Sequence, residues 1–161
     1  MRAIGVPTAQ ASVEVDAPAA AVWAIVSDVT RTPEWSPVCH RCEWVGDRRE
    51  PVVGARFRGH NRMNGARWWR ECEVTDAEPG VVFSFSTEFK GRESTRWRYR
   101  FEPSGTGTTV TEAYEIVSMP RWVRFLRRLP GALAKTERDT RRNLETSLAR
   151  LKAIVEQGEP A

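Results

Sequence analysis

Between residues 38 and 117 the chain repeats one pattern, in which short segments of alternating apolar and polar residues are separated by turns. Side chains along a strand point alternately to its two faces, so each segment predicts a strand with one buried face. A similar alternation around Val13 and Val15 predicts one earlier strand. The later segments cover residues 38–45, 54–64, 66–76, 81–90, 94–103 and 108–117.

Helical patterns occur after the first predicted strand and after the last one. Pro18 suits a first helical position, and the apolar stripe that follows it predicts a short helix. Pro33 and Pro37 frame Trp35, which predicts a single turn that buries this large ring. After the break at Pro130, apolar residues on one face predict a long C-terminal helix. That face carries Leu133, Leu144, Leu148, Leu151 and Val155.

Length and composition indicate an ordinary globular domain. A chain of 161 residues predicts one domain over 1–161, with an ordered core of about 10–157. Hydrophobic residues make up 40% of the chain and charged ones 29%. No apolar run approaches the roughly 20 residues that span a bilayer, and no signal-peptide core is found, so a cytoplasmic location is predicted. Three cysteines are an odd number, which predicts reduced thiols and no disulfide framework.

The order of the predicted elements is similar to that of a known fold family. A strand, two short helices, six strands and a long helix follow one another, with more specific similarities in residues 12–37, 54–62 and 107–115. This order resembles the helix-grip fold of the START, Bet v1 and polyketide cyclase superfamily (SRPBCC, polyketide cyclase/dehydrase-like). The resemblance implies an α+β fold in which a seven-stranded antiparallel sheet curls around the long C-terminal helix, with two short helices between strands 1 and 2. It also implies a cavity for an apolar molecule between sheet and helix.

The alternation assigns side chains to the concave face of this sheet, and helical spacing adds two residues from the last helix. Most of the inward set is apolar, but His40, Asn61, Arg70 and Glu112 are polar and need partners or water. Two interpretations stay open. These residues form the polar end of a ligand pocket, or Arg70 and Glu112 form a structural ion pair beside a satisfied core histidine. The predicted cavity lining is His40, Trp44, Phe57, Asn61, Trp68, Arg70, Phe83, Phe85, Trp97, Tyr99, Glu112, Tyr114, Thr140 and Leu144.

The spacing of Cys39 and Cys42, with His40 between them, invites comparison with metal and redox motifs. Residues three apart in a regular strand point to opposite faces, so these two thiols are predicted to diverge. A redox pair of this spacing sits at a helix N-terminus, and a structural zinc site needs a second ligand pair. The sequence has neither. The segment is therefore predicted to be a plain strand that binds no metal, and no cofactor is expected.

Arginine rows on the outward strand positions, a net charge of +4 and an isoelectric point near 9.3 raise the question of nucleic-acid binding. Glu71 and Glu73 are placed to pair across strands with Arg56, Arg58 or His60, which neutralises much of this charge. The aromatic residues point away from the arginines, whereas a stacking platform interleaves the two. Nucleic acid is therefore not an expected partner.

A second basic cluster lies in residues 121–129, where Arg121 and Arg124 accompany Trp122, Phe125 and Leu129. The pattern fits a helix packed on the domain with solvated arginines, or an amphipathic helix that makes transient membrane contact. The resemblance places this segment beside the cavity mouth, where it would act as a gate. No pattern in the chain indicates an oligomeric state.

The sequence contains no nucleophile elbow, no paired zinc-binding histidines and no glycine-rich phosphate loop. The resemblance implies a small hydrophobic ligand as partner, so the leading interpretation is binding of a lipid, polyketide or isoprenoid in the cavity. The alternative is a polyketide cyclase, aromatase or dehydrase that uses the same cavity, with Glu112, His40 or Arg70 as base, acid or oxyanion anchor. A basic surface that binds nucleic acid or anionic membrane is the third interpretation, and the sequence supports it least.

Overall fold

Seven strands form one antiparallel sheet in the order β1-β7-β6-β5-β4-β3-β2. The computed structural model describes residues 8–118 and 132–158, with side chains from Arg138 onward in the second range. Between β1 and β2 lie α1 (Ala19–Ser27) and the 3₁₀ helix η1 (Val29–Glu34), and α3 (Ala132–Gln157) follows the last strand. The predicted helix-grip fold is thus confirmed. The strands are β1 Ala9–Val15, β2 Cys39–Val45, β3 Arg56–Met63, β4 Ala66–Glu78, β5 Val82–Phe89, β6 Arg92–Ser104 and β7 Gly107–Ile116.

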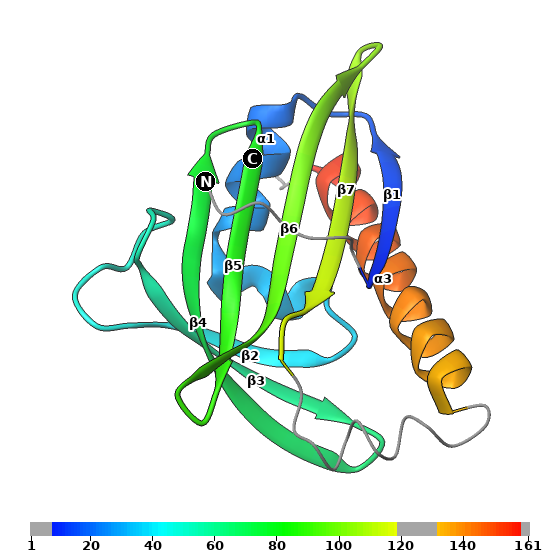
Figure 1. Cartoon of the computed structure of the whole chain (residues 1–161). Helices are drawn as coiled ribbons and strands as arrows, with labels where there is room; N and C mark the ends of the chain where they lie inside the picture. The colour runs from blue at the N-terminus through cyan, green and yellow to red at the C-terminus, as the bar shows by residue number, and fades with distance from the viewer. Residues whose placement is uncertain (1–7, 119–131, 159–161) are drawn as a thin grey trace.

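The sheet curls strongly, so that β2 and β3 cross below the other strands (Figure 1). The long helix α3 runs beside β1 and also contacts β7, whereas η1 packs on β2 at the other edge of the sheet (Figure 1). The helix α1 contacts β5 and β6. The indole N–H of Trp23 on α1 donates a hydrogen bond to the main-chain oxygen of Val82 at 2.9 Å. The three helices therefore cover the concave face of the sheet from different sides.

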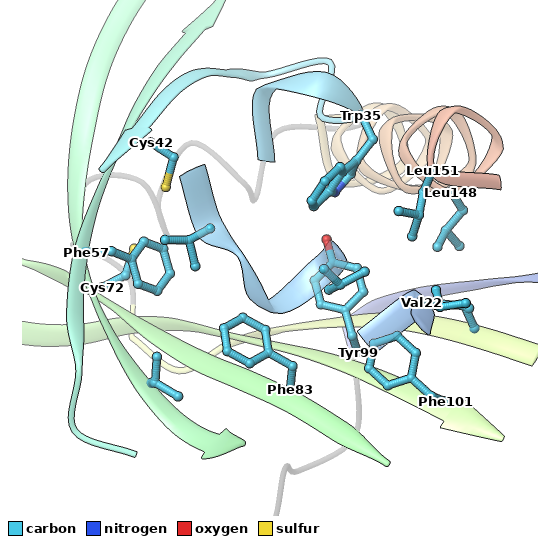
Figure 2. Close-up of a cluster of buried hydrophobic side chains, with 14 of the residues drawn as sticks. Val22, Trp35, Cys42, Phe57, Cys72, Phe83, Tyr99, Phe101, Leu148 and Leu151 are labelled. Carbon is cyan, nitrogen blue, oxygen red and sulfur yellow. The ribbon is translucent and has the colours of Figure 1, made fainter. Parts of the chain in front are cut away.

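The apolar stripe of α3 forms one side of the core, as predicted. Leu144, Leu148 and Leu151 are each at most 2% exposed, and Val155 is half-buried. Leu133, which was assigned to the same stripe, lies outside the described side chains. Helix and sheet therefore share a single hydrophobic core. The buried cluster that contains Leu148 and Leu151 also includes Val22, Trp35, Phe83 and Phe101 (Figure 2).

One extra residue in β2 changes which of its side chains face inward. Cys39 pairs with Asn61 on β3, and Arg41 pairs with the residue just before Asn61, so His40 is the additional residue of a β-bulge. His40 is exposed. The prediction that His40 faces the cavity is therefore wrong. The prediction that Cys39 and Cys42 point to opposite faces is wrong for the same reason, because the bulge shifts the alternation by one position.

Ion pairs between neighbouring strands cover the outer face of the sheet. Arg58 on β3 contacts Glu71 on β4 at 2.6 Å, which confirms that predicted pair. Arg56 pairs with Glu88 at 3.2 Å, although Glu71 or Glu73 was the predicted partner. Much of the arginine charge is thus balanced locally by carboxylates. Further pairs between strands include His60 with Glu43, Arg96 with Glu115, and Arg98 with Asp76, and pairs within one strand include Arg96 with Glu93, Arg100 with Glu102, and Arg41 with Glu43.

The basic cluster in residues 121–129, predicted to pack on the domain or contact a membrane, lies outside the described residues. Among the helices of residues 8–118 and 132–158, none is both long enough and apolar enough to cross a membrane. The long helix α3 has the length, but its exposed face carries charged pairs such as Arg141 with Glu145.

Candidate functional site

A cavity of about 450 Å³ lies between the concave face of the sheet and the helices η1 and α3. This volume is within the range of small-molecule sites in proteins. Two of the predicted lining residues, His40 and Trp44, do not border the cavity. Trp44 is half-buried and packs edge-on against Phe57, with ring centroids 5.8 Å apart. The predicted residues that do border it are Phe57, Asn61, Trp68, Arg70, Phe83, Phe85, Trp97, Tyr99, Glu112, Tyr114, Thr140 and Leu144.

A continuous row of aromatic rings crosses the sheet side of the cavity. Phe85, Trp97 and Tyr114 are direct cross-strand neighbours on β5, β6 and β7. The ring of Trp97 stacks on Phe85 at 6.3 Å and lies 4.8 Å from the ring of Tyr114. Phe57 extends the row with a centroid distance of 5.1 Å to Phe85. Aromatic faces of this kind favour stacking or edge contacts with other flat rings.

Glu112 on β7 supplies a carboxylate to this apolar cavity. Its side chain is buried, and the hydroxyl of Tyr99 on β6 donates a hydrogen bond to Oε1 at 2.6 Å. The second oxygen, Oε2, is buried with no hydrogen-bond partner among the described residues. Burial raises the pKa of Glu112 to about 7, although hydrogen bonding from Tyr99 and Ser147 acts in the opposite direction. Near neutral pH the carboxyl group is therefore present in both protonation states.

Trp35 and Ser147 complete the polar end of the cavity. The Tyr99 hydroxyl points toward the Trp35 ring (Figure 2). Burial and the neighbouring Glu112 raise the pKa of Tyr99, while Trp35 and Ser147 lie close enough to lower it in part. The indole N–H of Trp35 is nevertheless buried without a hydrogen-bond partner in the described part of the chain. A buried donor and a buried acceptor, Nε1 of Trp35 and Oε2 of Glu112, thus border the same cavity.

Arg70 lies at the other end of the cavity and does not pair with Glu112. Its guanidinium lies 4.7 Å from the centre of the Phe89 ring, and Nη1 donates to the main-chain oxygen of Trp69 at 3.0 Å. The ladder places Glu112 opposite Tyr99, and continuing across β5 it reaches Ala77 of β4. Arg70 is seven positions away along β4, or roughly 23 Å at 3.3 Å per residue. The predicted ion pair is therefore wrong.

All three cysteines border the cavity. The bulge turns Cys39 and Cys42 to the same face of β2, where both border the cavity. Cys72 on β4 lies close by and is buried (Figure 2). Within the residues that the structure describes, no three or more His, Cys, Asp or Glu side chains are arranged to hold a metal ion.

Comparison with known proteins establishes the family. Residues 7–156 match the family model described as "Polyketide cyclase / dehydrase and lipid transport". The chain belongs to this family. No curated protein matches the chain.

Solved structures similar to this polyketide cyclase/dehydrase family member share its fold. The Polyketide_cyc-like protein Cgl2372 from Corynebacterium glutamicum is 33% identical, with a TM-score of 0.62 over 95% of this chain and 94% of that one. The di-domain ARO/CYC proteins BexL and StfQ are 24% and 16% identical, with TM-scores of 0.67 and 0.70. In both comparisons 92% of this chain is covered, against 46% of BexL and 50% of StfQ. The chain thus spans about half the length of these two proteins, and the likeness shows the fold alone.

In this family member, sequence reasoning missed Trp35, Asn143 and Ser147 as cavity residues. Thr140, which was predicted, lies three and seven positions before the other two on α3, so all three fall on one helical face. Polar residues on the apolar face of a buried helix are the signal that could have found them. Trp35 was predicted to be buried in a turn, but nothing in the local sequence connects it with Tyr99 or Glu112.

Proposed function

We propose that this protein binds an apolar or amphipathic small molecule of lipid, polyketide or isoprenoid type, bearing a hydroxyl or carbonyl group. The observation that carries the proposal is the pair of unsatisfied buried atoms, Oε2 of Glu112 and Nε1 of Trp35, beside a largely apolar cavity. Leaving a buried donor or acceptor without a partner costs about 1–3 kcal/mol each. A ligand that hydrogen-bonds to both atoms removes that cost, which favours its binding.

The aromatic row supports a ligand with a flat ring system. The rings of Phe85, Trp97 and Tyr114 form one surface on which such a ligand can stack. Burying about 300 Å² of apolar ligand surface supplies roughly 7 kcal/mol before association costs are subtracted. The hydrogen bonds to Glu112 and Trp35 add to this term, and the sum is compatible with micromolar affinity. The family description, which includes both polyketide chemistry and lipid transport, is compatible with ligands of this class.

Titration with a hydroxylated anthraquinone tests the proposal. We expect saturable binding, measured by quenching of the tryptophan fluorescence of the protein. Glu112→Gln keeps the size of the side chain but removes its negative charge. It is expected to weaken binding by about 1–3 kcal/mol, the usual scale for a charge-assisted hydrogen bond.

Glu115→Gln is the matched control, because Glu115 lies on the same strand but contacts Arg96 on the outer face. This variant is expected to bind the anthraquinone as the parent protein does. Equal affinity of the parent and Glu112→Gln would remove Glu112 from the binding site. Absence of saturable binding by the parent would count against the proposal as a whole.

A second candidate function is proton transfer to or from the bound molecule. The observation that favours it is the pKa of Glu112, which burial raises to about 7. A general acid or base works best when its pKa is near the working pH. Dehydration of a β-hydroxy ketone requires removal of a proton next to the carbonyl group, and in this proposal the carboxylate of Glu112, which borders the cavity, accepts that proton.

If the protein catalyses this step, an aromatic β-hydroxy ketone is expected to lose water faster in its presence, with multiple turnovers. Glu112→Gln is expected to lower this rate by about 100-fold or more, the usual contribution of a general base. The ultraviolet absorbance of the conjugated product follows the reaction directly. Saturable binding without any acceleration would leave the protein as a binder only.

A further inference from the structure

The thiols of the cavity wall have no part in the proposed function, and their arrangement is specific. Cys39 is half-buried on the wall, whereas Cys42 and Cys72 are 8% and 4% exposed. The protonated thiol of Cys39 donates to the main-chain oxygen of Arg41 at 3.3 Å. Cys42 in turn hydrogen-bonds to the sulfur of Cys39.

The surroundings make Cys39 different from the other two thiols. The hydrogen bond from Cys42 lowers the pKa of Cys39, burial opposes this, and main-chain hydrogen bonds from Arg41 and His60 lower it further. The pKa of Cys42 is raised, chiefly because its thiol proton is held by that same hydrogen bond, and burial raises the pKa of Cys72. Cys39 is also the least buried of the three thiols, so an electrophile in the cavity reaches its sulfur most readily.

Access to the Cys39 sulfur is open on the side of β3. Gly59, the ladder partner of Cys42, leaves open space beside this sulfur, because a Cβ added at Gly59 would have the Cys39 sulfur, at 3.9 Å, as its one neighbour within 4 Å. The same stretch of wall contains Phe57 and Asn61. An apolar molecule in the cavity can therefore approach the sulfur without displacing a side chain at position 59.

We propose that Cys39 is a covalent attachment site, activated by Cys42, for apolar α,β-unsaturated carbonyl compounds that enter the cavity. The proposal uses the same cavity as the proposed function, but it does not depend on Glu112 or Trp35. Sulfur is a soft nucleophile, and the conjugated β-carbon of such a compound is a soft electrophile. The apolar wall concentrates the compound beside the sulfur.

The step balances without an oxidant or a second reactant. The Cys39 sulfur forms a bond to the β-carbon, and the carbon–carbon π pair moves to the α-carbon. The α-carbon then takes up a proton from water, which replaces the proton that Cys39 lost on forming the thiolate. The product is a thioether, and the mass of the protein rises by the full mass of the compound.

Reaction with alkyl vinyl ketones tests the site in the full-length protein. Intact mass and peptide mapping follow the adducts, with N-acetylcysteine as the free-thiol reference. We expect one adduct, on Cys39, and none at that mass in Cys39→Ser. For each ketone the rate of Cys39 alkylation is divided by its rate with N-acetylcysteine. This ratio is expected to be about 10-fold or more higher for a long-chain vinyl ketone than for methyl vinyl ketone, because only the long chain fills the apolar cavity.

Variants of Cys42 and Cys72 distinguish activation of Cys39 by Cys42 from mere accessibility of the Cys39 sulfur. Cys42→Ala removes the hydrogen-bond donor and is expected to slow the Cys39 reaction about 3-fold or more, while Cys42→Ser, which keeps a donor, restores the rate. Cys72→Ala is the matched control for loss of a buried thiol and is expected to leave the rate unchanged. Thermal unfolding of each variant establishes that it is folded before rates are compared.

The proposal is overturned by equal labelling of all three cysteines, by equal relative rates for the long and the short vinyl ketone, or by a Cys42→Ala rate equal to that of the parent. Adduct formation on Cys39 in a parent protein that shows no saturable anthraquinone binding would distinguish this proposal from the proposed function, because the attachment site would then stand while the proposed function failed. A loss of two hydrogen masses in place of an adduct would show disulfide formation and would equally overturn the attachment site.

Discussion

Replacing Glu112 with glutamine is expected to stabilise the folded protein at pH 8 relative to the parent, and to have much less effect near pH 4.5. The pKa of Glu112 is about 7 in the folded protein, against 4.5 for an ordinary glutamate. The folded state therefore binds more protons than the unfolded state between these two values. The stability that protonated Glu112 contributes is complete below about pH 4.5 and is lost as the pH rises to about 7.

The size of this effect follows from the two pKa values. Their difference corresponds to about 3 kcal/mol in the free energy of unfolding, because desolvation penalises the buried carboxylate. Glutamine resembles the protonated acid at every pH, so the variant avoids that penalty. Urea denaturation of both proteins at pH 5 and pH 8 measures the change. A difference between variant and parent that is the same at both pH values would contradict the prediction.

Glu115→Gln again provides the control. The same chemical change is made on the same strand, but on the outer face beside Arg96. We expect no gain in stability at pH 8 for this variant. Comparing the two variants cancels the titration of the other carboxylates, which are present in both proteins.

Replacing Leu148 with alanine is expected to lower the free energy of unfolding by about 2–5 kcal/mol, the usual cost of truncating a fully buried leucine. Leu148 is 2% exposed and lies in the core that α3 shares with α1 and the sheet (Figure 2). Truncating its isobutyl side chain to a methyl group leaves a void that the rigid sheet cannot close. Chemical denaturation with a fluorescence readout measures the loss.

Arg150→Ala tests whether the effect belongs to the buried face of α3. Arg150 is two positions further along the same helix and is exposed. Its replacement is expected to change the unfolding free energy by less than about 0.5 kcal/mol. Equal losses in the two variants would mean that helix propensity, and not burial against the sheet, sets the cost.

The fold could be predicted from the sequence because the two-residue alternation of strands and the helical spacing of apolar residues are both visible in short segments. Alternation along 94–103 separates Trp97, Tyr99 and Phe101 from the intervening arginines, and the structure places these aromatic residues on the concave side of β6. Turn residues mark the ends of the strands, and the leucine spacing of α3 marks its buried face. Each of these signals lies within a few residues along the chain.

The errors in the candidate site arise where knowing which face of the sheet a side chain occupies does not determine which other side chains it meets. Alternation assigned Arg70 and Glu112 correctly to the cavity side, but it contains no information on position along the strands. Which residues meet across the sheet depends on the register of β4 through β7. The bulge at His40 has a related cause, since neither glycine nor proline marks the extra residue in β2. Because of this one extra residue, Cys39 faces inward and His40 faces outward, which is the reverse of the prediction.

The strand order also affects when the sheet can close during synthesis. β1 pairs with β7, and the hydroxyls of Ser12 and Thr111 meet at 2.8 Å across a separation of 99 residues in the chain. At about 5–20 residues per second, the ribosome delivers β7 roughly 5–20 s after β1. The hairpins from β2 to β7 can form in order as they emerge, whereas β1 waits with its main-chain groups unbonded to any strand. Closing so long a loop is the slow kind of contact in folding, and a nascent chain of this fold therefore exposes its first strand to chaperones throughout that interval.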